Sequence, residues 1–90
     1  MAERVESFVA ECYWPDVREE DVRALDQRVA AALDDDVRYL GSVLMRADEV
    51  VLCFFAGSEA SVRRAAEQAS IPFERILEAA RSPWPKVVNP

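Results

Sequence analysis

The first patterned segment runs from Glu6 to Trp14, where apolar side chains occupy every second position. Phe8, Ala10, Cys12 and Trp14 alternate with Val9, Glu11 and Tyr13. A period of two in a run rich in aromatic residues predicts a β-strand. Pro15 and Asp16 end this strand, and Asp16 is also a suitable N-terminal cap for a following helix.

From Glu19 the apolar spacing changes to steps of three and four, which predicts an amphipathic helix as far as about Leu33. Its apolar positions are Val22, Leu25, Val29, Ala32 and Leu33. Acidic residues in the first turn suit the positive end of the helix dipole. The acidic run 34–36 lacks the spacing of a calcium loop, so we interpret it as a solvated turn.

Two further strands are predicted, from Val37 to Met45 and from Val50 to Ala56, joined by the short polar link 46–49 as a hairpin. Simple alternation places Val37, Tyr39, Gly41, Val43 and Met45 on one face of the first, with Leu40 and Leu44 on the other. The second is a near-continuous apolar run, which is typical of a central strand covered on both faces.

A second helix is predicted after Ser58, a natural N-cap, and it closes at Ile71-Pro72. Its buried face comprises Val62, Ala65, Ala66 and Ala69. The segment 74–80 is ambiguous: local propensity favours a helix, whereas the topology favours a last strand. Ser82-Pro83-Trp84-Pro85 cannot continue a helix, so residues 81–90 are predicted to form an extended tail.

The order β-α-β-β-α-(β) predicts an α+β, ferredoxin-like fold: an antiparallel sheet with two helices on one face. We therefore expect one domain over residues 1–80 and a tail over 81–90. The other sheet face is left open, and burial against a second copy's sheet would make a homodimeric α+β barrel.

The amino-acid composition of the chain argues against several classes of function. The chain has 90 residues, 51% of them hydrophobic, and a net charge of −6, which argues against nucleic-acid binding. It has no histidine, and its two cysteines, Cys12 and Cys53, are best explained as buried structural residues. The charged start and an apolar run of only seven residues predict no signal peptide and no membrane contact, hence a cytoplasmic protein.

Three segments carry a family resemblance. They are Phe8-Val9-Ala10-Glu11-Cys12-Tyr13-Trp14-Pro15 with Glu20-Asp21-Val22, then Val37-Arg38-Tyr39-Leu40-Gly41-Ser42, then residues 62–76, read VRRAAEQASIPFERI. Together they resemble a family of small bacterial ferredoxin-like proteins of unknown function that includes a nickel-binding member.

The resemblance implies a ferredoxin-like fold that pairs through its sheets, a last strand in the ambiguous segment, and nickel as a cofactor. The chain departs from the family at Ala66, where members often carry Asn or His, and at Ser70, where they carry Gly. Because nickel prefers nitrogen ligands, carboxylates alone would make a weak and unselective site in a chain without histidine.

Glu11 is the main candidate for chemistry, because it lies opposite in phase to Phe8 and Cys12 and matches a Glu of the family motif. Buried between two sheets, it could act as a general acid or base with Tyr13 orienting a substrate. Arg38 or Tyr39 could neighbour it across the sheet. The structural alternative is a Glu paired with an Arg at the sheet edge.

Three functions remain open. The first is a homodimeric binding protein for nickel or another small ligand, with Glu11, Tyr13, Trp14, Arg38 and Tyr39 as ligand-binding residues. The second is a cofactor-free enzyme of the monooxygenase, isomerase or cyclase type acting on an apolar metabolite, by fold analogy. The third is an acidic partner-binding subunit. Four aromatic residues have two possible roles: they could line a pocket for an apolar or aromatic ligand, or they could pack in the core or in an interface. These residues are Trp14 and Trp84, with Tyr13 and Phe73.

Overall fold

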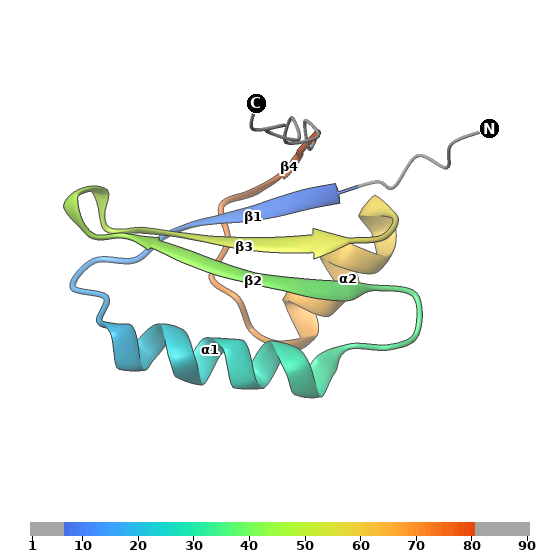
Figure 1. Ribbon diagram of the computed structural model, residues 1–90, viewed down its shortest axis with the longest axis horizontal. Coiled ribbons are helices and arrows are strands. Elements are labelled where there is room, and N and C mark those ends of the chain that lie inside the picture. Colours follow the sequence, from blue (N-terminus) through green and yellow to red (C-terminus); the bar gives the residue numbers. More distant parts are fainter. Residues whose placement is uncertain (1–6, 81–90) are drawn as a thin grey trace, which may run out of the picture.

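A computed structural model describes residues 7–80 of the chain. Four strands form one antiparallel sheet with the order β2-β3-β1-β4, and Figure 1 shows both helices on the same side of it. The elements are β1 (Ser7–Tyr13), α1 (Glu19–Ala32), β2 (Arg38–Met45), the short 3-10 helix η1 (Arg46–Asp48), β3 (Val50–Ala56), α2 (Glu59–Gln68) and β4 (Arg75–Glu78). This order confirms the ferredoxin-like α+β fold.

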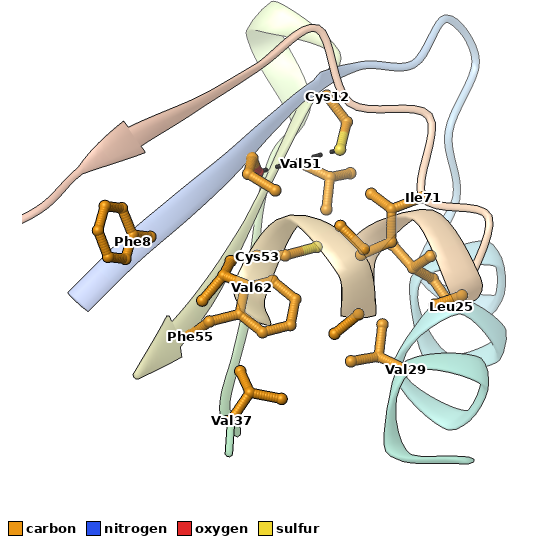
Figure 2. Close-up of a cluster of buried hydrophobic side chains, with 14 of the residues drawn as sticks. Phe8, Cys12, Leu25, Val29, Val37, Val51, Cys53, Phe55, Val62 and Ile71 are labelled. Carbon is orange, nitrogen blue, oxygen red and sulfur yellow. Dashed lines mark hydrogen bonds between the residues drawn. The ribbon is translucent and has the colours of Figure 1, made fainter. Parts of the chain in front are cut away.

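The core lies between the sheet and the helices, because alternate residues of the two central strands face the helices (Figure 2). Strands β1 and β3 supply Phe8, Ala10, Cys12, Val51, Cys53 and Phe55, and the helices supply Leu25, Val29, Val62 and Ala66 among others. Phe55 and Leu25 are both fully buried. Burying a side chain of this size stabilises the fold by about 1.5–3 kcal/mol.

Helix α1 begins differently from the expectation that Asp16 caps it. The N-cap residue is Arg18, whose backbone N–H donates to Asp21 Oδ2 at 2.9 Å, the reach-back bond of a capping box. Asp16 instead has a φ of 61°, and its N–H donates to Glu49 Oε2 at 2.9 Å. The prediction that Asp16 caps α1 is therefore wrong, because the backbone turns sharply at Asp16, three residues before the helix begins.

Helix α2 has the predicted cap and buried face. Ser58 Oγ accepts from the Ser61 N–H at 3.2 Å. The helix ends in a Schellman motif, in which the Ser70 N–H donates to the Glu67 oxygen and the Ile71 N–H to the Ala66 oxygen, both at 3.0 Å. Ser70 occupies the left-handed position of this motif, with a φ of 57°.

The ambiguous segment after Pro72 forms a strand. Strand β4 pairs antiparallel with β1 over Phe8–Glu11, and the Glu74 N–H donates to the Glu11 oxygen at 2.8 Å. The segment has good helix formers, yet it lies beside the free edge of β1, and pairing satisfies the backbone groups of that edge. Tertiary contact overrides local propensity here.

A β-bulge in β2 contradicts the predicted alternation of that strand. Tyr39 pairs with Phe55 and Gly41 with Phe54, so Leu40 is the extra residue, and Gly41 takes a φ of 113°. One inserted residue exchanges the two faces of the strand beyond it. Tyr39 therefore faces the helices, while Val43 and Met45 face the opposite side.

Among the described residues, no helix is both long and apolar enough to cross a bilayer.

Candidate functional site

The face of the sheet away from the helices carries the candidate site, and we call it the open face. Five of its large apolar side chains are exposed: Tyr13 53%, Leu40 49%, Val43 47%, Met45 42% and Leu77 37%. Val9, Val50, Leu52 and Phe54 lie between them in the strand register. A contiguous exposed apolar surface of this kind marks an interaction or ligand-binding site.

Glu11 lies on the open face and is engaged by an arginine. Arg75, its register partner on β4, donates from Nε to Glu11 Oε1 at 2.5 Å. This hydrogen bond and the charge of Glu11 raise the pKa of Arg75. The structural interpretation of Glu11, an ion pair with an arginine near the sheet edge, is thus the one that the geometry supports.

Tyr13 shares the open face with Glu11, and Glu74 links the two. The Tyr13 N–H donates to Glu74 Oε1 at 2.9 Å, while the Glu74 N–H donates to the Glu11 oxygen. Glu74 and Arg75 therefore belong to this end of the open face, although sequence analysis did not select them. Only the register of β4 against β1 reveals them, and that register depends on the ambiguous segment being a strand.

Three other predicted site residues do not join Glu11. Arg38 pairs with Ala56, whereas Glu11 pairs with Leu52 farther along β3. Trp14 follows β1 and packs partly buried against the core. Tyr39 faces the helices because of the bulge, so Tyr13 is the one predicted partner that stays beside Glu11.

Tyr39 belongs to a polar cluster beneath the sheet. Its hydroxyl donates to Asp26 Oδ1 at 2.5 Å, and the Ser42 hydroxyl donates to the same oxygen at 2.8 Å. Burial and the hydrogen bond to Asp26 raise the pKa of Tyr39. The cluster links α1 to β2 on the helix side of the sheet.

Both cysteines are free thiols, and Figure 2 shows them within the core. Cys12 and Cys53 lie on neighbouring strands, two register positions apart on the helix side. The hydrogen bond with Cys53 and burial raise the pKa of the Cys12 thiol. The thiol form is the unreactive one, so this environment suits a structural role.

The donor groups do not fit a nickel centre. Within residues 7–80, no three or more acidic, cysteine or histidine side chains come close enough to share a metal ion. The carboxylates at the Glu11 end of the open face are those of Glu11 and Glu74, and Arg75 already holds the first. Asp34 of the acidic turn is exposed and pairs with Arg64 at 3.6 Å.

The predicted aromatic pocket is not assembled from the described residues. Tyr13 lies on the open face, whereas Trp14 and Phe73 pack against the core, and the Arg63 guanidinium lies 6.0 Å from the Phe73 ring centroid. Trp84 lies outside the described residues. A cavity of about 430 Å³ does open on the open face, at the end away from Glu11. Its lining residues are Ser7, Leu40, Phe54, Ala79 and Ala80.

Comparisons with known proteins identify a similar crystal structure and the family of the chain. The crystal structure of SCO4226 from Streptomyces coelicolor A3(2) is similar to it, with a TM-score of 0.74 and 20% sequence identity over 84% of this chain and 98% of that one. No curated protein matches significantly. A family model described as nickel responsive protein SCO4226-like matches residues 8–79. The chain is therefore a member of the SCO4226-like family of nickel responsive proteins.

Proposed function

We propose that this chain is a small cytoplasmic binding protein that works as a homodimer, with the two open faces packed together around a small ligand. The observation that carries the proposal is the unpartnered apolar surface of the sheet, with five large side chains exposed by 37–53%. Burying such side chains against a second copy removes apolar area from water, which is the main driving force of association.

Charge on the open face also favours self-association. The chain has a net charge of −6, but the charged groups at the Glu11 end are Glu11, Glu74 and Arg75, and the Glu11–Arg75 ion pair leaves one net negative charge there in each copy. The repulsion between two such faces is therefore much smaller than the total charge suggests. A small domain gains most from such burial, because it covers only about 60–65% of its unfolded surface by folding alone.

The ligand that suits this surface has an apolar body and one polar group. Val9, Leu52 and neighbouring side chains would contact the apolar body, and the exposed Arg75 beside Glu11 would meet the polar group. The family is described as nickel responsive, but the oxygen donors of residues 7–80 provide no selective site for that metal.

Dimerisation through the open face is tested by the Val43→Asp variant. A charge within the proposed interface would have to be buried unpaired, so we expect the wild-type protein to have twice the chain mass in light scattering and Val43→Asp to have the chain mass. Because Val43 is 47% exposed within one copy, the variant should keep its circular dichroism spectrum.

The matched control is Ala30→Asp, a charge placed on the exposed surface of α1. It should leave the doubled mass unchanged. A wild-type protein that stays at the chain mass throughout the concentration range would overturn the dimer, as would equal dissociation of both variants.

A further inference from the structure

The open face carries two different features at the two ends of a track along β1 and β4. At one end the cavity of about 430 Å³ is lined by Ser7 and Ala79 among others. At the other end Arg75 donates from Nε to Glu11 Oε1 at 2.5 Å. Ser7 and Glu11 belong to the same strand and the same face. Because a strand rises about 3.3 Å per residue, the two ends lie about 13 Å apart.

The open face between these two ends is apolar. Strand alternation places Val9 midway along the track, and its register partners are Leu77 on β4 and Phe54 on β3. Leu77 is 37% exposed, and Phe54, partly buried, also lines the cavity. A ligand that lies along the track therefore contacts hydrocarbon over most of its length, which favours a slender alkyl chain.

The polar end of the track offers both hydrogen-bond donors and an acceptor. Arg75 uses its Nε for Glu11, and within residues 7–80 its two Nη groups have no acceptor. In the same part of the chain, Glu11 Oε2 receives no hydrogen bond. A head group that accepts from Arg75 and donates to Glu11 can therefore bind across the ion pair.

The charge at this end favours an uncharged head group. Glu11, Glu74 and Arg75 leave one net negative charge there, and the whole chain has a net charge of −6, so an anionic head is repelled. A cationic head would meet the guanidinium of Arg75, which is 61% exposed. A primary amide has no charge, one carbonyl acceptor and two N–H donors, so it matches the pair.

We propose that the ligand of the open face is a primary fatty amide, with its amide at the Glu11–Arg75 pair and the end of its alkyl chain in the cavity beside Ser7. This inference rests on the proposed function, in which the second copy covers the exposed side of the chain. Decanamide is the probe, because its extended chain is close in length to the track.

An NMR titration of the ¹⁵N-labelled full-length protein with decanamide reports on both ends at once. We expect saturable shifts of the Arg75 Nε–Hε signal and of the Ala79 backbone amide. Hexanamide has the same head but too short a chain to reach the cavity, so we expect it to bind at least ~10-fold more weakly. Shifts confined to one end, or equal affinity for the two amides, would overturn the proposal.

Decanoate and decylamine keep the alkyl chain and change the charge of the head. At neutral pH we expect each to bind at least ~10-fold more weakly than decanamide, because the first meets net negative charge and the second meets Arg75. If either ion bound as tightly as decanamide, the uncharged head group would be wrong.

Ala79→Leu and Glu78→Leu are a matched pair of variants at the cavity end. Ala79 lines the cavity, whereas Glu78 is the register partner of Phe8, a core residue, and so lies on the helix side. Ala79→Leu fills the cavity, and we expect decanamide to bind it at least ~10-fold more weakly. Glu78→Leu should bind as the wild type does, and equal losses in both variants would contradict a chain end in the cavity.

The light-scattering mass, measured on the same samples, separates this inference from the proposed dimer. A doubled mass without decanamide shifts would overturn the fatty amide and leave the homodimer intact. The chain mass with shifts at both ends would overturn the homodimer and support the fatty amide on a single copy.

Discussion

Asp26 shows how a single residue connects two elements. Its Oδ1 atom accepts hydrogen bonds from the Tyr39 and Ser42 hydroxyls, so one carboxylate on α1 satisfies two polar side chains of β2. Hydrogen bonds to a charged group contribute about 1.5–3 kcal/mol each. Tyr39 is held in place on the helix side, where its ring also packs 5.1 Å from the Phe55 ring, centroid to centroid.

The raised pKa of Tyr39 predicts a loss of stability in alkali. The unfolded chain releases this phenol proton near pH 10, whereas the folded protein retains it, so above pH 10 the unfolded state binds fewer protons. The free energy of unfolding therefore falls as the pH rises beyond about 10. We expect Tyr39→Phe to lose about 1.5–3 kcal/mol at neutral pH and to show a shallower alkaline decline, measured by urea unfolding at a series of pH values.

Tyr13→Phe is the control, because the Tyr13 side chain is 53% exposed and outside the Asp26 cluster. It should retain both the neutral stability and the alkaline decline of the wild type. If Tyr39→Phe declined with the same slope as the wild type, Tyr39 would not be the titrating group.

At the scale of elements, helix α2 combines a favourable start with a strained end. Ser58 caps the N-terminus, but the C-terminal Schellman motif places Ser70 at a φ of 57°. A side chain in the left-handed region costs roughly 1–2 kcal/mol, and glycine avoids this cost. Ser70 is therefore the position of α2 at which a glycine would relieve the backbone.

We therefore expect Ser70→Gly to stabilise the protein by about 1 kcal/mol, seen as a higher urea midpoint with an unchanged slope. The matched control is Gln68→Gly, two residues earlier on the exposed side of the same helix. Its backbone is helical, so the same replacement should destabilise by about 1 kcal/mol. Changes of the same sign in both variants would contradict the strain at Ser70.

Most elements of the fold follow from local pattern, and the exceptions have physical causes. Strand β1 and the buried face of α2 were predictable because their apolar residues follow one period throughout. The faces of β2 were not, because the bulge at Leu40 shifts the phase by one residue without a strong signal in the sequence. Strand β4 depends on an edge of β1 that no local window contains.

At the scale of the whole molecule, the family name and the donor groups lead to different expectations for nickel. The chain belongs to the SCO4226-like family, yet it has no histidine, and residues 7–80 bring no three metal-ligating side chains together. Family membership therefore implies the fold, including the open face. It does not by itself imply a metal site, because such a site depends on a few ligand residues that substitutions can remove.

Titration calorimetry on tag-free protein tests whether the chain has the family's fold without a site for nickel. We expect nickel and zinc to give no saturable heat, because isolated carboxylates bind divalent nickel weakly and unselectively. The same chain carrying a histidine tag is the positive control and should bind. Stoichiometric binding by the tag-free protein would contradict the prediction, and Glu11→Gln would then show whether carboxylates of two facing copies form the site.

The sequence by itself determined the order of the elements as far as α2 and the buried faces of β1, α1 and α2, because each depends on the periodicity of neighbouring side chains. It also placed Glu11 and Tyr13 on one face, since residues two apart in a strand point the same way. Only the tertiary structure decided the partner of Glu11, the side on which Tyr39 lies and the cavity beside Leu40. Each of these depends on strand register, which is set by the packing of residues that are distant in the chain.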